Sequence, residues 1–194
     1  MLIDKLGRPM QDLRISILDR CNFRCPYCMP VQEFTDDYQF LKKTERLTHD
    51  EIFRLAKIFS DLGVNKLRIT GGEPLLDKKL PSLIGRLASL EGIDDLALTT
   101  NGMLLANYAE KLVKAGLKRV TISLDSIDPD VYKSMSGNRG NLLKALEGIT
   151  VAERVGLTPI KINVVVQRGV NDHTILDTLD RFRGTGHVVR LIEF

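Results

Sequence analysis

The sequence predicts an α/β fold in which parallel strands form one curled sheet with helices on its outer face. Short β-rich runs alternate with amphipathic helical patterns, which is typical of parallel strands joined by right-handed crossovers. This alternation alone fits either a doubly wound sheet or a barrel. Each β-rich run also alternates apolar and polar side chains, so only one face of the sheet suits helices. Six such runs are too few for a closed eight-stranded barrel.

The candidate strands share this two-sided pattern, and they lie at 13–18, 66–70, 96–100, 119–125, 160–166 and 188–194. In the second strand, Leu67 and Ile69 point to one face. Lys66, Arg68 and Thr70 point to the other. Strands covered by helices on both faces would be apolar throughout, so the alternation predicts a polar lumen inside the curl.

The helix before the second strand carries the clearest local signals. Thr48 and Glu51 form a capping box, and apolar residues then recur at helical spacing as far as Leu62. Gly63 ends the pattern. Further helices are expected over 78–90, 104–115, 139–156 and 174–183.

Composition and charge bound the class of protein. The chain is 43% hydrophobic and 27% charged, and no linker-like stretch divides residues 1–194, so we expect a single domain. It has no run of about 18 apolar residues to span a membrane. Its N-terminus lacks the apolar core of a secretory signal, so a cytoplasmic location is expected. A net charge of +3 without a basic run gives no indication of nucleic-acid binding.

Five cations fall on the polar faces of the predicted strands: Arg14, Lys66, Arg68, Lys161 and Arg190. Unpaired, they would repel one another in a space of low dielectric constant. An anionic ligand with several charges, such as a polyphosphate, would relieve this repulsion. The alternative is that they reach water at the rim or pair with Asp125 and Glu193.

All three cysteines of the chain lie in CNFRCPYC, as Cys21, Cys25 and Cys28. This C-x3-C-x2-C segment follows the first strand, at the end of the sheet where α/β folds place active sites. Reduced cysteines in such a cluster indicate a metal site.

The number of thiolates separates two kinds of metal site. Zinc would need a fourth ligand from His49, His173 or His187, and the first two lie in sequences typical of helix starts. A four-iron cluster takes one thiolate per iron, so three thiolates leave one iron open for a substrate. The odd count therefore favours a reactive iron–sulfur cluster.

A second motif, ITGGEPLL, ends the second strand. Gly71 and Gly72 predict a tight turn with unusual backbone angles, which also lets the backbone approach a ligand. Glu73 follows at once and brings a carboxylate to the same rim as the cysteines.

Together, these motifs resemble the signature of the radical S-adenosylmethionine (radical SAM) superfamily. The resemblance implies a partial (β/α)6 barrel of the TIM type, and a 4Fe-4S cluster on Cys21, Cys25 and Cys28. The open iron would chelate SAM, and reductive cleavage would give a 5′-deoxyadenosyl radical. The SAM contacts it implies are Gly71, Gly72 and Glu73 at the methionine amino end, Tyr27 beside the adenine, and Ser123 at the ribose or methionine.

Longer segments, DRCNFRCPYCMP, LRITGGEPLL, TTNG, VTISLDS and KINVVVQRGVND, are similar to the GTP 3′,8-cyclase family of molybdenum cofactor biosynthesis. This implies a lyase that abstracts hydrogen from C3′ of GTP and forms 3′,8-cyclo-7,8-dihydro-GTP. The GTP contacts it implies are Arg14, Arg68, Thr99 and Lys161, with Lys66 and Arg190 joining them.

The resemblance also implies partners and one departure. An electron donor of flavodoxin or ferredoxin type would reduce the cluster, and cyclic pyranopterin monophosphate synthase would take the product. The sequence leaves the oligomeric state open and is compatible with a homodimer. The family carries a C-terminal extension with three more cysteines, whereas this chain ends at VVRLIEF. We therefore expect a truncated chain that is poor or inactive in the full cyclisation.

Two other functions stay open at this point. One is a radical SAM enzyme that acts on a peptide or an RNA, against which TTNG and the cationic lumen argue. The other is a metal-binding structural module without catalysis.

Overall fold

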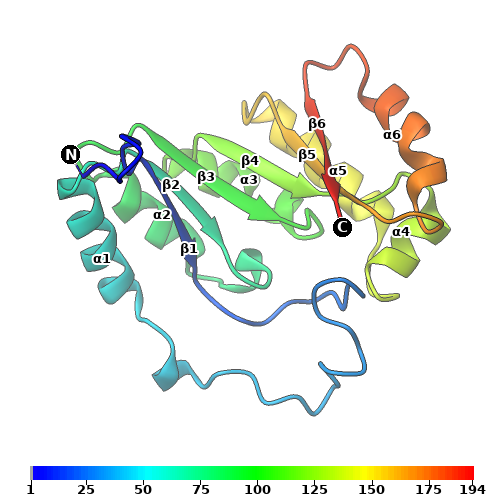
Figure 1. The fold of residues 1–194 in the computed structure, drawn as a ribbon, viewed down its shortest axis with the longest axis horizontal. Coiled ribbons are helices and arrows are strands. Elements are labelled where there is room, and N and C mark those ends of the chain that lie inside the picture. Colours follow the sequence, from blue (N-terminus) through cyan, green and yellow to red (C-terminus); the bar gives the residue numbers. More distant parts are fainter. Residues whose placement is uncertain (1) are drawn as a thin grey trace.

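The computed structural model describes residues 2–194. Six parallel strands form one sheet in the order β1-β2-β3-β4-β5-β6, so every strand pairs with its neighbours in the chain (Figure 1). The strands are β1 (Asp12–Ser16), β2 (Lys66–Thr70), β3 (Asp95–Thr100), β4 (Arg119–Ser123), β5 (Lys161–Val166) and β6 (Val188–Glu193). All six predicted strands are confirmed, and β1 and β4 end two residues earlier than predicted.

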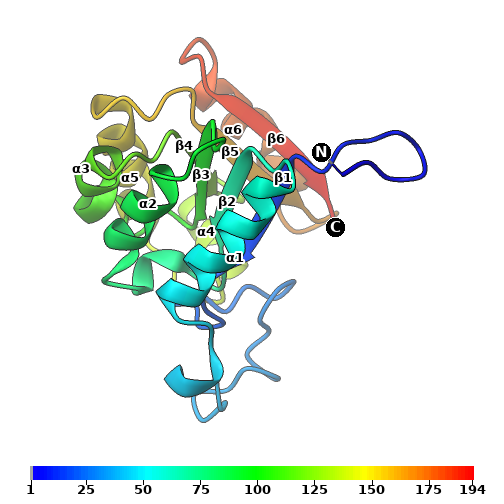
Figure 2. The same cartoon turned by 90° about the vertical axis from the view of Figure 1, so that its left-hand side faces the viewer.

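Helices join the strands and cover one face of the sheet (Figures 1 and 2). They are α1 (His49–Asp61), α2 (Leu80–Ala88), α3 (Leu105–Lys114), α4 (Pro129–Met135), α5 (Leu142–Arg154) and α6 (Ile175–Phe182). Short 3₁₀ turns occupy η1 (Lys43–Glu45), η2 (Pro74–Leu76) and η3 (Asp172–Thr174). Among residues 2–194, no helix is long and apolar enough to cross a bilayer.

The capping box at the start of α1 is confirmed. The Thr48 hydroxyl accepts a hydrogen bond from the Glu51 amide at 3.2 Å, and a Glu51 carboxylate oxygen accepts one from the Thr48 amide at 2.8 Å. Helix α4 was not predicted from the sequence. It is only seven residues long, and its start rests on Asp128, which accepts hydrogen bonds from the amides of Asp130 and Val131.

The strand register explains the two faces of the sheet. Leu67 and Ile69 of β2 are almost fully buried under the helices, as are Leu98 of β3 and Ile122 of β4. In β2 and β4 the residues between them stay partly exposed on the other face, as the alternation predicted, whereas Ala97 of β3 is buried. The α/β class and the polar inner face are therefore confirmed.

The segment between β1 and α1 leaves the end of the sheet and loops outward before it returns to α1 (Figure 1). Its first part continues beside the end of β2, because the Ile17 amide donates to the Thr70 carbonyl at 3.0 Å and the Gly72 amide donates to the Leu18 carbonyl at 2.7 Å. The cysteines follow at once. Parallel strands thus deliver the cysteine segment and the GGEP turn to the same edge.

Candidate active site

One cavity at the carboxyl ends of β1 to β4 brings together the residues predicted to hold the cluster and SAM, whereas the five predicted lumen cations lie outside its lining. Its volume is about 210 Å³, and its lining includes all three cysteines together with Tyr27, Gly71, Gly72, Glu73, Thr99 and Ser123. These residues come from the loops after β1 and β2 and from the last residues of β3 and β4. The sequence analysis did not single out Thr100, Asn101, Tyr132 and Ser136, which also line the cavity.

The cysteine segment is held in a compact turn. The amides of Cys28 and Met29 both donate to the Cys25 carbonyl, at 3.0 and 2.8 Å. Cys21 and Cys25 are partly buried, and Cys28 is exposed. A metal can therefore enter from the Cys28 side.

Burial controls the ionisation of two of the thiols. It raises the pKa of Cys21 to about 11, and the negative charge of Glu73 adds to this effect. Burial likewise raises the pKa of Cys25 to about 12, helped by the charge of Asp125. The positive charge of Arg24 lowers the pKa of Cys21 and so acts in the opposite direction. Both thiols are thus neutral at physiological pH until a metal displaces their protons.

The histidines offered as zinc ligands lie elsewhere. His49 sits 2.7 Å from Asp77 across the start of α1, and His187 sits 2.8 Å from Glu153. His173 is exposed beside α6. None of the three lines the cysteine cavity. Within residues 2–194, no three His, Cys, Asp or Glu side chains gather around a single metal ion. This arrangement gives zinc no fourth ligand.

The two glycines of GGEP are required by close packing. Gly71 has φ +153°, and a Cβ there would lie 2.6 Å from the Leu18 carbonyl oxygen. A Cβ on Gly72 would overlap the carbonyl oxygen of Arg20. The Glu73 amide donates to that same carbonyl at 2.8 Å. The glycines therefore let the cysteine segment pack directly on the turn that carries Glu73.

Glu73 is a buried carboxylate, with only 1% of its surface exposed. Oε1 accepts hydrogen bonds from the Leu75 amide at 3.0 Å and the Thr100 hydroxyl at 2.7 Å. Oε2 accepts one from the Asn101 amide at 2.8 Å. Burial raises the pKa of Glu73, while these hydrogen bonds oppose the shift. The carboxylate is fixed in the wall of the cavity.

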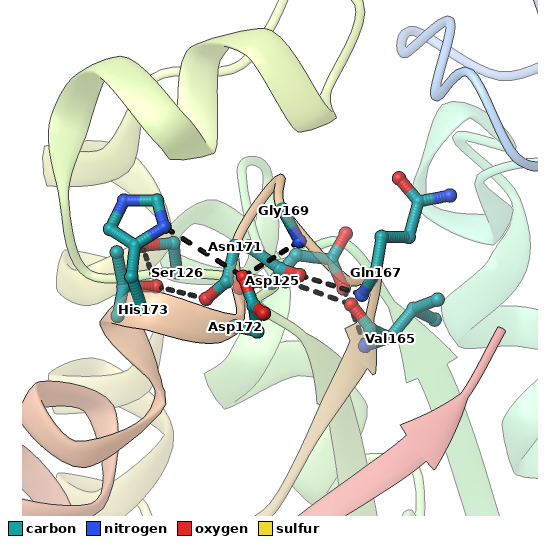
Figure 3. Close-up of polar contacts among 9 residues, drawn as sticks. Asp125, Ser126, Val165, Gln167, Gly169, Asn171, Asp172 and His173 are labelled. Carbon is teal, nitrogen blue, oxygen red and sulfur yellow. Dashed lines mark hydrogen bonds and ion pairs between the residues drawn. The ribbon is translucent and has the colours of Figure 1, made fainter.

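Asp125 also lines the cavity. The Tyr27 hydroxyl donates to Oδ2 at 2.6 Å, and the Val165 amide donates to Oδ1 at 2.9 Å. The Asn171 side-chain amide donates to the carbonyls of Asp125 and Val165, both at 2.8 Å (Figure 3). The sequence offered Asp125 as a partner for the lumen cations. It pairs instead with Tyr27 and with the backbone amide of Val165 near the end of β5.

The five predicted cations project from the inner face of the sheet. Register places Arg14 beside Arg68, and Arg190 beside Asn163 on the next strand. Among residues 2–194, none of the five forms an ion pair with a carboxylate. The pKa of Lys161 is lowered, first by burial and then by the charges of Arg119, Arg190 and Arg68. The charge of Asp95 acts on Lys161 in the opposite direction. Arg14 and Arg190 are exposed, so they reach water at the rim, as the alternative interpretation held, whereas Lys66, Arg68 and Lys161 are only partly exposed.

Arg119 was missed by the sequence analysis. It begins β4 opposite Ala97 and shares the polar face with Thr121, so its place in the alternation could have revealed it. Its guanidinium pairs with the Asp95 carboxylate, unlike the other cations on this face.

Comparison with known proteins identifies the family. The sequence profile of the radical SAM superfamily matches residues 15–182. This chain belongs to the radical SAM superfamily. Radical SAM proteins use a 4Fe-4S cluster and SAM, so the cofactors that the resemblance implied are confirmed at the level of the superfamily.

Curated relatives are similar to the chain along almost all of its length. A GTP 3′,8-cyclase of Xanthomonas axonopodis pv. citri (strain 306) is 53% identical over 191 residues, which cover 98% of this chain and 57% of the relative. A GTP 3′,8-cyclase of Staphylococcus aureus (strain JH9) is 49% identical and covers 98% of this chain and 56% of the relative. The chain thus spans a little over half the length of these radical SAM relatives.

Solved radical SAM structures confirm the fold. Streptococcus suis SuiB bound to S-adenosylmethionine superposes with a TM-score of 0.77 at 20% identity, covering 96% of this chain and 41% of SuiB. Methylornithine synthase (PylB) gives a TM-score of 0.73 at 17% identity, covering 96% of this chain and 54% of that protein. The partial radical SAM barrel predicted from the sequence is therefore correct.

The donor set fits a cluster of the radical SAM kind. Three thiols face one cavity, and the histidines that could close a tetrahedral zinc site are absent from its lining. The two glycines leave backbone without side chains at the same wall, where a ligand can approach closely. Three cysteines and an open approach match a cluster with one iron left for SAM.

Proposed function

We propose that this chain is the barrel portion of a GTP 3′,8-cyclase that acts in molybdenum cofactor biosynthesis. The observation that carries the proposal is the row of cations on the inner face of the sheet, beneath the cysteine cavity. Bound cofactors would supply a 5′-deoxyadenosyl radical that takes hydrogen from C3′ of GTP, which then closes onto C8. The names of the relatives at 49–53% identity support the same reaction.

The cysteine side of the cavity would hold the cofactors. Cys21, Cys25 and Cys28 would ligate three irons of the cluster. Backbone at Gly71 and Gly72 would approach the amino end of SAM. The Glu73 carboxylate would attract the SAM ammonium group, although three donors already fix it within the wall. Tyr27 and Ser123 line the same cavity. Tyr27 would lie beside the adenine, and Ser123 would reach the ribose or methionine part.

The lumen side would hold the nucleotide. Lys66, Arg68 and Lys161 are partly buried without carboxylate partners, and a triphosphate would neutralise several of these charges at once. Arg14 and Arg190 are exposed and could also reach a bound triphosphate. The proposed GTP contacts are Arg14, Lys66, Arg68, Thr99, Lys161 and Arg190. Thr99 also lines the cysteine cavity, so it would stand between the two ligands.

Two measurements on anaerobically reconstituted protein test this proposal: GTP binding, and the yield of 5′-deoxyadenosine with and without GTP. We expect GTP to bind and to raise the yield of 5′-deoxyadenosine in protein extended to the length of the relatives. Failure of GTP to bind or to change that yield would remove GTP as substrate. Unchanged SAM cleavage in the same samples would leave the radical SAM assignment standing.

The partners and the location follow from this proposal and stay predictions. They are an electron donor of flavodoxin or ferredoxin type, cyclic pyranopterin monophosphate synthase downstream, and a cytoplasmic setting. A radical SAM enzyme of peptide or RNA substrates remains the alternative, and the likeness to SuiB concerns the fold alone.

A further inference from the structure

Arg24 is a buried cation inside the cysteine segment. Its surface is only 5% exposed. Its Nη1 donates to the carbonyls of Cys21 and Phe23, both at 2.9 Å, and its Nε donates to the Phe34 carbonyl at 2.8 Å. The guanidinium therefore ties the start of the cysteine segment to the loop that follows it.

Arg24 has no carboxylate partner among residues 2–194. Carbonyl oxygens satisfy its donors, but in the described part of the chain no carboxylate lies within ion-pair distance of it. Arginine is rarely buried without a partner, because removing a charge from water is costly. An unpaired buried cation beside metal ligands indicates an anion that arrives with the metal.

Around the cavity itself, buried negative charge is in excess. Of the Asp, Glu, Lys and Arg residues between positions 2 and 194, three are buried: Arg24, Glu73 and Asp125. All the hydrogen-bond donors to Glu73 and Asp125 are neutral amides or hydroxyls. Three thiolates would add more negative charge to this wall. Arg24 is then the one buried cation that can offset it.

The backbone of Arg24 is fixed as firmly as its side chain. Its amide donates to the Ser136 carbonyl at 3.1 Å, just after α4. Gly137 has φ +68°, and a Cβ there would overlap the Arg24 carbonyl. The guanidinium also lies 5.5 Å from the centre of the Phe40 ring. These contacts fix the position of the guanidinium, whereas the side chain of an exposed arginine is free to move in water.

We propose that Arg24 is a positioning residue that provides the counter-charge for the cysteine-ligated cluster. It would hold the backbone of Cys21 in place and stabilise the negative charge that the thiolates bring into a buried site. A nearby cation stabilises the more negative, reduced form of a cluster, so Arg24 would also make the cluster easier to reduce. The proposal rests on the cluster and not on GTP as substrate.

The test compares three variants: Arg24→Gln, which removes the charge; Arg24→Lys, which keeps the charge without the planar fork; and Arg20→Gln. Arg20 is the matched control, because it adjoins Cys21 and faces the same Phe40 ring but is exposed. The readouts are iron loss to a chelator, the reduction midpoint followed by EPR, and thermal unfolding of the metal-free chain.

We expect Arg24→Gln to lose iron about tenfold faster than the unaltered chain and to have a more negative midpoint. Arg24→Lys should keep the midpoint close to the original value, and Arg20→Gln should match the unaltered chain in both readouts. A midpoint for Arg24→Gln equal to that of Arg20→Gln would overturn the proposal. Equal midpoint shifts in Arg24→Gln and Arg24→Lys would also overturn it, because the role would then be structural only.

A variant that fails to fold does not leave the proposal untested. If metal-free Arg24→Gln fails to fold, Arg24→Lys still tests the proposal, because a midpoint for Arg24→Lys clearly more negative than that of Arg20→Gln would overturn it, and an unchanged midpoint would support it.

Discussion

The Tyr27 hydroxyl donates a 2.6 Å hydrogen bond to the carboxylate of Asp125, which lies 98 positions further along the chain. This bond joins the cysteine segment to the end of β4. Asp125 in turn accepts from the Val165 amide at the end of β5. The cysteine segment is therefore anchored across the sheet before any cofactor is bound.

Removing the Tyr27 hydroxyl should weaken this anchor. We expect Tyr27→Phe to lower the free energy of unfolding of the metal-free chain by about 1–3 kcal/mol, because a buried carboxylate loses one of its donors. Urea unfolding measures the change. Tyr108→Phe is the control, since no hydrogen bond from the Tyr108 hydroxyl exists within the described residues and its loss should change little. Equal effects of the two substitutions would show that the Tyr27 bond does not stabilise the fold.

Replacing the Glu73 carboxylate by an amide should lower the stability of the fold. In Glu73→Gln, the new NH₂ group would face either the Asn101 amide or the donors from Leu75 and Thr100, so two donors would meet. We expect a loss of about 1–3 kcal/mol in the free energy of unfolding. Exposed Glu33→Gln is the control for a surface change of the same kind. A Glu73→Gln chain as stable as this control would contradict the buried geometry.

The buried thiols should make the metal-free chain sensitive to alkaline pH. The ordinary thiol value is 9.0, and the folded pKa values are about 11 for Cys21 and about 12 for Cys25. Both are raised, so the stability linked to these thiols is present below pH 9 and is lost as pH rises towards 12. Unfolding measured at pH 8 and at pH 10.5 should show the loss.

Serine substitutions identify the source of that pH dependence. A Cys21→Ser/Cys25→Ser chain should lose most of it, whereas Cys28→Ser should keep it. Alkylation at pH 8 should also modify exposed Cys28 first, because thiolate fraction and exposure set the rate. Uniform alkylation of the three thiols would contradict the burial of Cys21 and Cys25.

Substituting the lumen cations should weaken nucleotide binding and leave SAM cleavage unchanged. We expect Arg68→Ala and Lys161→Ala each to weaken GTP binding about tenfold, the value of one charge-assisted contact to a phosphate. Calorimetry measures GTP affinity, and 5′-deoxyadenosine without GTP measures SAM cleavage. Exposed Lys144→Ala is the control on the outer helix α5. Equal losses of GTP binding and SAM cleavage would contradict two separate subsites.

The sequence predicts those features that depend on local pattern. Period-two alternation located the strands and the polar face with Arg14 and Arg68, and the capping box located the start of α1. The position of CNFRCPYC directly after a parallel strand located the site, because parallel strands end at a common edge.

Contacts between distant segments could not be predicted in the same way. The Tyr27–Asp125 bond and the Arg119–Asp95 pair depend on how loops and strands meet in three dimensions. From the sequence alone, each of these polar residues would be expected on the surface. The burial of Arg24 is a stronger example, since arginine is usually exposed. Helix α4 was not predicted because seven residues are too few to show a helical repeat of apolar positions.

The most direct measurement of the central claim is EPR of the anaerobically reconstituted and reduced chain, with iron and zinc counted in the same sample. Ligation of a four-iron cluster by Cys21, Cys25 and Cys28 predicts about four irons per chain and a cubane signal that changes when SAM is added. Alanine at any one of these cysteines should abolish the SAM-dependent change while the fold persists. Stoichiometric zinc without a four-iron signal, or a cluster signal that SAM leaves unchanged, would contradict the claim.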